Sequence, residues 1–550
     1  MAPMLATAPR QTLIEAAAVA GIMILATAVL FAPWMAHLST ALIGPAEDNL
    51  QDFWNSWYAA VGSKPGQFFT TDLIRFPEGT PLTYHSFAYP QVFLLVALTK
   101  LFGTGRETLI LLQNLTVLLS FPAAGTGAYY LVRHFTHNAA ASLAGSFVFA
   151  FNPWHVAQVM HHAHVSWIGF IPFFVLAYLL ALERKSWIWL CVSIVFYALS
   201  ALSCWYYLFY LGFFILFHAV YLSLRDNALP KGWTLAAPLA CVAGTMLLLS
   251  PLLVPMALQS APRAYYNGSN DFGADLFGYV IFPPTHLLGS WAHDAFARLS
   301  GNPWESAIYL GVINLALVVW YRAVTWRKGE PVLVYALCGM ATFCVFAAGE
   351  TLHVFGHDFT AVHLPDIVLS KIPFVANVRT PERAVVIVFL FLSIAVGRAL
   401  SSVPPRVLAG LALLILADFW PANLAMTEIP CAPALDAIAH DRSAGFGVLN
   451  LPSGYIEGNF YMSEQTCHGK PIVQGNVSRI MRQSLIDDLD TSDLGKQRDQ
   501  LVRAHVKYIV LERARDGLFN WPAADALPDA YLKTYPTAAR SADITVLKVY

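Results

Sequence analysis

The sequence predicts an α-helical, polytopic membrane protein with a smaller α/β domain at its C-terminal end, and three observations carry this prediction. Of the 550 residues, 57% are hydrophobic and only 12% are charged, whereas an average soluble domain carries about twice that charged share. The mean hydropathy is +0.54, and apolar stretches of bilayer-crossing length, roughly 17 to 25 residues, recur through the first three quarters of the chain. Beyond residue 420 charge returns and the apolar runs shorten to strand length.

The apolar stretches predict about eleven transmembrane helices. The first, Leu13 to Met35, is too long for the core of a signal peptide and lacks a small-residue cleavage site, so it is interpreted as a retained anchor. The other ten are 108–132, 139–154, 165–182, 186–203, 205–224, 233–258, 304–321, 331–349, 382–399 and 404–420. Residues 1–420 are therefore expected to form the transmembrane domain, and residues 421–550 a separate domain.

The segment from Phe87 to Gly103 is ambiguous, and basic residues help to place it. If it lies on the membrane surface as an interfacial helix, the basic residues of the loops all fall on one side, which the positive-inside rule makes cytoplasmic. These residues are Arg10, Arg133, Arg184, Lys185, Arg225, Lys231, Arg322, Arg327, Lys328, Arg398 and Arg406. The alternative, twelve spans, would move every later basic loop to the side opposite Arg10. Eleven spans and a cytoplasmic N-terminus are therefore favoured.

This topology places a long first loop, about 37–107, and the tail 421–550 on the periplasmic side. In the tail, residues 446–451, 508–511 and 544–547 are typical of buried strands, and 478–490 and 495–504 are typical of helices. Cys431 and Cys467 both lie in this domain, where an oxidising periplasm would permit a disulfide, although two free thiols fit the sequence about as well. The net charge of −1 excludes the basic footprint of a nucleic-acid binder.

The first loop contains the strongest chemical candidates, Glu47 and Asp48, directly after the first span. Adjacent carboxylates beside a membrane are costly to desolvate, which makes them functional candidates. Such a carboxylate could accept a proton from an attacking hydroxyl or hold a divalent ion. The alternative is a solvated acidic turn that caps the following helix.

In its order of features the chain resembles the GT-C superfamily of membrane glycosyltransferases. A first span leads to a long outer loop with an acidic pair and an interfacial helix, and a soluble domain lies at the C-terminus. In closer detail it resembles a group of poorly characterised, glycosyltransferase-like membrane proteins of bacteria. The stretches that carry this likeness are 75–86 (RFPEGTPLTYHS), 379–383 (RTPER) and 468–472 (HGKPI).

The resemblance implies a transferase of the bacterial inner membrane. A sugar would pass, with inversion, from a polyprenyl-phosphate-linked donor to a glycan, glycolipid or protein acceptor on the periplasmic face. The acid of the family's first loop falls on Glu47 and Asp48, and Asp48 is the expected base. Many relatives place a second acid between the third and fourth spans, where this chain has His161, His162 and His164.

The histidines leave three interpretations open. His162 and His164 could hold a divalent metal ion such as Mg or Mn together with Asp48, since imidazole is a common ligand. They could instead face the lipid phosphate as protonated imidazoles, or they could be interfacial histidines bonded to water.

Other candidates are expected to bind substrate. Arg379 and Arg383 flank Pro381 at the start of a span, with Glu382 between them, and arginine matches phosphate oxygens with a planar fork. The alternative is that both arginines reach the lipid headgroups. His85 could contact the donor phosphate or merely end the polar loop, and Trp54 could stack on a sugar.

Two further classes of protein compete with the transferase. A transporter or lipid flippase is disfavoured because the spans carry few ionisable residues at mid-depth and no matching half-sequences. A non-catalytic scaffold with the same fold, binding an envelope partner through its outer domain, is the other alternative.

Overall fold

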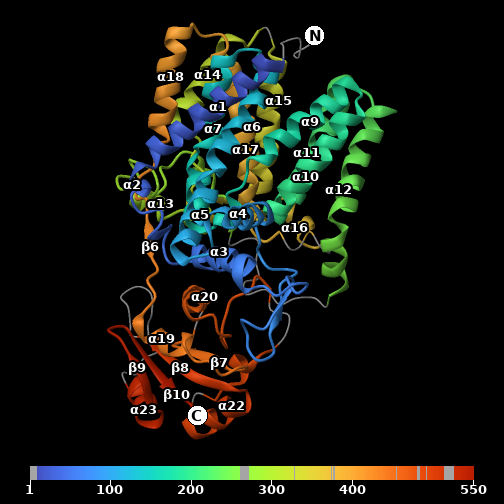
Figure 1. The fold of residues 1–550 in the computed structure, drawn as a ribbon. Helices are drawn as coiled ribbons and strands as arrows, with labels where there is room; N and C mark the ends of the chain where they lie inside the picture. The colour runs from blue at the N-terminus through green and yellow to red at the C-terminus, as the bar shows by residue number, and fades with distance from the viewer. Residues whose placement is uncertain are drawn as a thin grey trace.

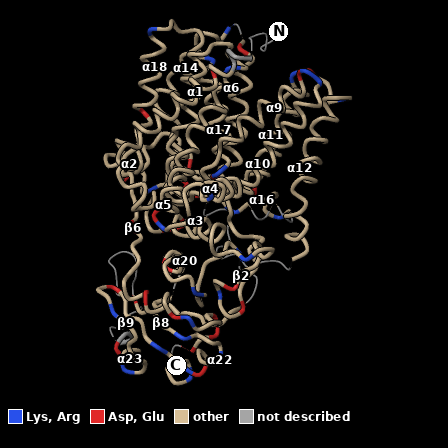
Figure 2. The backbone as a smooth tube through the Cα atoms, in the orientation of Figure 1, with Lys and Arg blue, Asp and Glu red and all other residues tan. Residues whose placement is uncertain are grey.

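The computed structural model describes residues 9–259, 272–327, 329–372, 375, 378–453, 455–479, 483–490, 492–512 and 526–550. A bundle of long helices forms one end of the molecule, and a small β-sheet with its own helices forms the other (Figure 1). Figure 2 shows few charged residues along the bundle, whereas many lie in the part that contains the sheet.

Each of the eleven predicted spans contains a helix. The bundle helices are α1 (Pro9–Leu30), α5 (Arg106–Leu118), α6 (Ser120–Thr136), α7 (Ala139–Ala150), α9 (Phe170–Arg184), α10 (Trp187–Ser203), α11 (Trp205–Asp226), α12 (Trp233–Leu258), α14 (Val312–Val324), α15 (Pro331–Ala347), α17 (Val385–Leu400) and α18 (Pro405–Asp418). Within the described residues, 6 stretches are long and apolar enough to cross a membrane, and α7, α10, α14 and α15 are shorter apolar helices. The count of eleven transmembrane helices and the side of the membrane on which each loop lies stay predictions. Of the basic residues used to predict the topology, Lys328 lies outside the described residues.

Helix α17 is the centre of the bundle, because all of its residues except Arg398 are buried. It crosses α7 at Gly145, where a Cβ atom would lie 2.8 Å from the carbonyl oxygen of Ser393. Small residues allow such close helix crossings inside membranes, where apolar burial alone does not drive association. By contrast, α1 and α12 lie at the edge of the bundle, with many exposed leucines and isoleucines.

In two predicted spans the α-helix starts several residues after the predicted start. The apolar run 304–321 becomes helical only at Val312, since Asp418 accepts a hydrogen bond from the N–H of Ile313 (3.0 Å) and so caps the start of α14. The run 165–182 becomes the α-helix α9 only at Phe170, after the short helix η2 (Ala163–Val165). In both cases the residues before the helix are close to the cavity described below.

The loops at the lower end of the bundle contain short elements. These are α2 (Ala32–Met35), β1 (Ala41–Ile43), α3 (Asp48–Trp57), β2 (Thr70–Thr71), β3 (Thr80–Pro81), α4 (Tyr89–Phe102), α8 (Pro153–His161), α13 (His293–Phe296), β4 (Thr351–Val354), β5 (His357–His363), α16 (Asp366–Leu369) and η6 (Pro381–Ala384). Helix α3 lies across the lower end of the bundle, and α4 lies above it beside α5 (Figure 1). Helix α4 corresponds to the predicted interfacial helix 87–103; it buries Leu95 but exposes Phe93 and Leu101.

The C-terminal part is built on a four-stranded sheet in the order β7-β8-β10-β9. Its elements are β6 (Met426–Glu428), α19 (Asp436–Ala439), β7 (Gly447–Leu451), α20 (Tyr455–His468), α21 (Leu485–Asp488), α22 (Leu494–Arg503), β8 (Val506–Glu512), α23 (Ala526–Thr534), β9 (Thr537–Arg540) and β10 (Ile544–Lys548). Strand β7 runs parallel to β8, and the other pairs are antiparallel. Alternate residues of β8 face opposite cores: Val510 packs with Phe460 of α20, and Ile509 with Leu501 of α22. Burial on both faces explains the continuous apolar runs that predicted these strands.

The first loop and the C-terminal part are joined by several contacts. Strand β1 pairs with β6, so the segments that follow α1 and α18 lie side by side. The N–H of Phe76 donates to the carbonyl oxygen of Ile472 (3.1 Å), and Arg75 forms an ion pair with Asp487 (2.8 Å). These contacts join segments on both sides of the predicted domain boundary at residue 421, so that boundary stays a prediction.

Two local features of the C-terminal part correct or complete the sequence analysis. The helix predicted over 478–490 is wrong for most of the described residues, which are helical only in α21, and residues 480–482 lie outside them. The sequence also did not predict α20, which packs against α3. Cys431 and Cys467 form a disulfide with their Cα atoms 5.7 Å apart.

Candidate functional site

A cavity of about 520 Å³ lies between the lower end of the bundle and the C-terminal part. This volume is within the range of small-molecule sites. One side is apolar and includes Leu208, Phe209 and Met256, from α11 and α12. The polar lining residues are Glu47, Asp48, Gln51, Tyr84, Ser86, His161, His162, His164, Ser203, Cys204, Tyr206, Asn302, Trp304, Glu305, Arg379, Thr380, Arg383, Asn459, Ser478 and Arg479.

Asp48 is the first residue of α3, so its carboxylate lies at the positive end of the helix dipole. One oxygen, Oδ1, accepts a hydrogen bond from Nδ2 of Asn459 (3.2 Å), and Oδ2 lies 3.9 Å from Nε2 of His162. Burial raises the pKa of Asp48 from 3.8 to about 6, with smaller contributions from neighbouring charges of both signs. Its side chain nevertheless keeps 25% of its surface open to the cavity. A carboxyl group with this pKa can both accept and release a proton near neutral pH.

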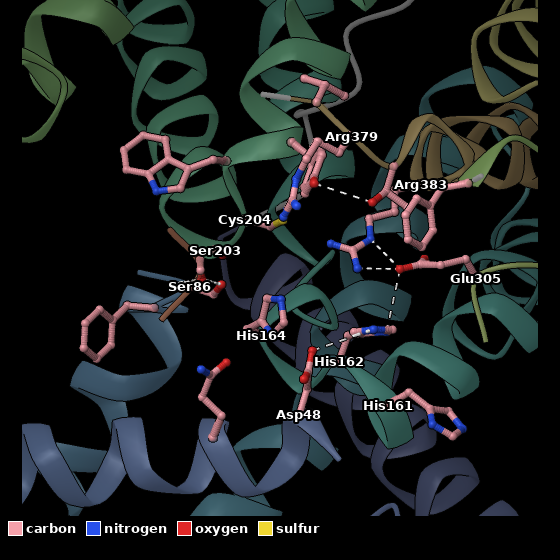
Figure 3. Close-up of a pocket in the computed structure, with 18 of the residues that line it drawn as sticks. Asp48, Ser86, His161, His162, His164, Ser203, Cys204, Glu305, Arg379 and Arg383 are labelled. Carbon is pink, nitrogen blue, oxygen red and sulfur yellow. Dashed lines mark hydrogen bonds and ion pairs between the residues drawn. The ribbon is translucent and has the colours of Figure 1, made fainter. Parts of the chain in front are cut away.

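A chain of polar side chains runs from Asp48 across the cavity (Figure 3). His162 Nδ1 lies 3.7 Å from Glu305, and Glu305 accepts a hydrogen bond from Nε of Arg383 (2.8 Å). Burial and the nearby Arg383 guanidinium hold the pKa of His162 well below its usual range. His162 is therefore neutral at physiological pH, and Glu305 and Arg383 form a buried ion pair beside it.

The other two histidines of the cluster each contact a different acid. His161 Nδ1 lies 2.9 Å from Oε2 of Glu47, and its ring stacks on Trp304 with centroids 3.9 Å apart. His164 Nδ1 lies 3.2 Å from Oδ2 of Asp52, which also accepts the backbone N–H of His164 (3.1 Å). These contacts orient the segment 161–164 against the start of α3.

The proposed metal ligands do not form a ligand set. Across the described ranges, no group of three His, Cys, Asp or Glu side chains has the arrangement of a metal site. The ring centroids of His162 and His164 are 6.1 Å apart, and His164 Nδ1 contacts Asp52 rather than Asp48. Metal ligands lie within about 2.3 Å of the ion, so Asp48, His162 and His164 in this geometry do not fit a shared metal ion.

Three arginines line the cavity, and they differ in their partners. Arg383 is paired with Glu305 and lies over the ring of Tyr206, 5.0 Å from its centroid. Arg479 donates to the carbonyl oxygen of Ser478 (2.8 Å) and forms no salt bridge with any carboxylate of the described chain. Burial and the nearby charge of Arg379 lower the pKa of Arg479 to about 10. Arg379 and Arg479 both line this cavity, and two cations on one cavity suit a ligand with negative charge.

Three residues predicted to bind substrate do not line the cavity. Trp54 is fully buried and donates through Nε1 to Oε1 of Gln465 (2.7 Å), so it joins the first loop to α20. His85 is buried against Asn55, with Nε2 2.7 Å from Oδ1, and burial lowers its pKa to about 3. Glu382 accepts a hydrogen bond from Ser306 (3.3 Å) and is also fully buried.

Among the lining residues that sequence reasoning missed, three carry charge or contact the charged groups: Glu305, Asn459 and Arg479. The sequence does contain a signal for Glu305. This residue directly follows Asn302-Pro303-Trp304, which repeats the tripeptide Asn152-Pro153-Trp154, and it lies next to an apolar run, as Glu47 and Asp48 do. Asn459 lies in a helix that was not predicted, and Arg479 lies in a segment predicted to be helical. No signal in the sequence places either of them at the cavity.

Solved structures show which fold this is. The chain is similar to the oligosaccharyltransferase of Archaeoglobus fulgidus tethered to an acceptor peptide, with a TM-score of 0.52 and 12% identity over 90% of this chain and 69% of that one. The apo form gives a TM-score of 0.52 and 11% identity over the same shares. ArnT from Cupriavidus metallidurans in the apo state has a TM-score of 0.43 and 12% identity, over 97% of this chain and 98% of that one. The likeness to the oligosaccharyltransferase confirms the predicted fold class: the chain has a GT-C-like fold.

The family can be stated as well. Residues 68–419 match the model of a family described as a domain of unknown function, DUF6311, and the chain belongs to that family. No curated protein matches the chain in sequence.

Proposed function

We propose that this protein is an inverting glycosyltransferase of the bacterial inner membrane that uses a polyprenyl-phosphate-linked sugar. The observation that carries the proposal is the partly exposed carboxylate of Asp48, which shares a cavity with the cations Arg379 and Arg479 at one end of an apolar helical bundle. Such a cavity can hold a sugar between a base and an anionic leaving group. In the proposed topology the N-terminus is cytoplasmic, and the cavity and the C-terminal part are periplasmic.

Asp48 is the proposed general base. Its Oδ2 accepts the proton of the acceptor hydroxyl as the hydroxyl oxygen bonds to the anomeric carbon of the donor. The bond from that carbon to the phosphate oxygen breaks, and its electron pair leaves with the polyprenyl phosphate. General-base catalysis by a positioned carboxylate contributes about 10²- to 10⁴-fold. Glu47 supports the base indirectly, because its contact with His161 orients the segment opposite Asp48.

Arg379 and Arg479 are the proposed phosphate ligands. The sequence favoured Arg379 and Arg383, but Glu305 already neutralises Arg383. Arg383 is therefore assigned to positioning Glu305 and His162. The apolar wall formed by Leu208, Phe209 and Met256 suits the polyprenyl chain beside the surrounding membrane lipids. No step is assigned to a metal ion, because the cavity residues do not form a ligand set.

The proposal is tested by mass spectrometry of envelope glycans and glycolipids from four strains. They are the wild type, a deletion, and the deletion complemented with Asp48→Asn or with Asp499→Asn at matched protein level. Asp499 is exposed on α22 and serves as the control. One sugar is expected to be lost in the deletion and in Asp48→Asn but restored by Asp499→Asn, and its mass identifies the class of donor. Full restoration by Asp48→Asn would leave the scaffold or flippase as the better account.

A further inference from the structure

Asn459 is the one hydrogen-bond donor within the described chain that contacts the carboxylate of Asp48 at bonding distance. It lies on α20, more than 400 positions further along the sequence, and its side chain is buried. Its Nδ2 donates to Oδ1 of Asp48 (3.2 Å), and its Oδ1 accepts from Nδ2 of Asn476 (2.9 Å). The bond from Asn476 fixes the orientation of the amide, so its N–H₂ group must face Asp48.

The neighbours of Asn459 hold this amide in place. Gln51, on the same helix as Asp48, donates through Nε2 to the backbone oxygen of Asn476 (3.0 Å). A Cβ atom on Gly458 would lie 2.7 Å from Oδ1 of Asn476, so glycine at this position allows the close approach. A chain of hydrogen bonds therefore runs from Gln51 of α3 through Asn476 and Asn459 to Asp48 of the same helix.

We infer that Asn459 is a positioning residue for the base: the C-terminal part of the chain completes the catalytic geometry by fixing one oxygen of Asp48. This inference rests on the proposed role of Asp48. Since Oδ1 is occupied by Asn459, Oδ2 is the oxygen that remains directed at the cavity and His162. The acceptor hydroxyl therefore meets a carboxylate in a defined orientation, with Oδ2 on the side of His162.

The donor also affects the charge of Asp48. A hydrogen bond to the ionised form favours that form, so Asn459 opposes the burial that raises the pKa of Asp48. The charged and titratable groups that act on Asp48 are Glu47, Asp52, His162, His164 and Arg383, and Glu305 contacts His162 in turn. Removing Asn459 leaves all of these in place and removes the only neutral donor bonded to Asp48 among the described residues.

The test measures protonation of Asp48 directly, without a sugar substrate. The full-length protein in detergent is treated with dicyclohexylcarbodiimide, which modifies protonated carboxyl groups, at a series of pH values. Mass spectrometry of the peptide with Asp48 gives the midpoint of labelling, and Asp48→Asn identifies the signal that belongs to this residue. The midpoint in the unchanged protein is expected near pH 6.

Asn459→Ala is expected to raise the midpoint by about one pH unit, as the loss of one hydrogen bond to a charged group predicts. Asn459→Asp has almost the same shape, lacks the Nδ2 donor, and is expected to raise the midpoint further. The matched control is Asn314→Ala, a buried asparagine in the bundle that donates to the carbonyl oxygen of Leu310, which should leave the midpoint unchanged.

An unchanged midpoint in either Asn459 variant that retains its thermal unfolding transition would overturn the inference. If Asn459→Ala does not fold, Asn459→Asp decides the matter alone. The labelling result does not depend on catalysis, so an absence of sugar transfer would overturn the proposed function without affecting this measurement.

Discussion

The cavity around Asp48 and the loop junction around Asp275 each hold a carboxylate, but Asp275 is fully buried whereas Asp48 is partly exposed, and the two carboxylates have different partners. Asp275 accepts hydrogen bonds from the backbone N–H groups of four residues: Phe277 (2.9 Å), Ser300 (3.2 Å), Phe355 (2.8 Å) and Gly356 (2.7 Å). Asp48 accepts one bond from Asn459 and faces an open cavity. A buried charge with all its bonds satisfied holds loops together, whereas one with a free oxygen in a cavity is available for chemistry.

Replacing Asp48 should have the largest effect on activity. Asp48→Asn removes the proton acceptor and keeps the shape, so the rate of sugar transfer should fall about 10²- to 10⁴-fold. The thermal unfolding temperature should stay the same or rise, because the variant no longer buries a partly desolvated charge. A variant that loses activity only in proportion to lost folded protein would contradict the distinction between the two carboxylates.

Replacing Asp275 should have the opposite pattern. In Asp275→Asn an amide N–H₂ group faces backbone donors, so the free energy of unfolding should fall by about 3 kcal/mol. The folded fraction should still transfer sugar at the normal rate. Denaturation in detergent combined with activity per folded molecule measures both quantities. A normal stability with reduced specific activity would place Asp275 in the catalytic machinery instead.

Lowering the pH should reduce the transfer rate but should reduce the destabilisation that Asp48 causes. Because the pKa of Asp48 is raised to about 6, the base is protonated below that pH, and the transfer rate should fall about tenfold per pH unit. The folded protein binds this proton more tightly than the unfolded chain does. The destabilising contribution of Asp48 is therefore fully present above pH 6 and is lost as the pH falls toward 3.8.

The stability difference between the wild type and Asp48→Asn, measured from pH 4 to pH 7, isolates this contribution. It should be largest at neutral pH. A difference that does not change with pH would mean that Asp48 does not titrate in this range.

The smallest effect is expected at Trp54, which the sequence suggested as a sugar-stacking residue. Trp54→Phe keeps a ring against Tyr58, whose centroid lies 5.0 Å away, but loses the bond to Gln465. The free energy of unfolding should fall by about 1 kcal/mol, with unchanged KM for the donor. A raised KM at normal stability would restore the earlier interpretation.

The fold was predictable because each helix of the bundle is encoded by an apolar run that can be recognised in the local sequence. Every predicted span contains a helix, and the three strands of the tail that were predicted are β7, β8 and β10. The starts of α9 and α14 were misplaced, since their first residues are set by tertiary contacts such as that of Asp418 with Ile313.

The site was predictable only in part. Asp48, Arg379 and the histidines of 161–164 do line one cavity. Glu305, Asn459 and Arg479 come from segments hundreds of positions away, and their place depends on how α20 and the later loops pack. Trp54 and His85 were predicted to bind substrate but instead join segments of the chain. An aromatic or polar residue with that structural role cannot be told apart in the sequence from one that binds a ligand.

The central claim, that Asp48 is the single base of an inverting transfer, is tested most directly by the configuration of the product. The purified protein in lipid nanodiscs is given the lipid-linked sugar that the glycan profile identifies, and the anomeric configuration is read by NMR for the wild type and for Asp48→Asn. One base and one displacement predict inversion, with no product from Asp48→Asn on the same timescale. Retention of configuration, or an unchanged rate without the Asp48 carboxylate, would contradict the account.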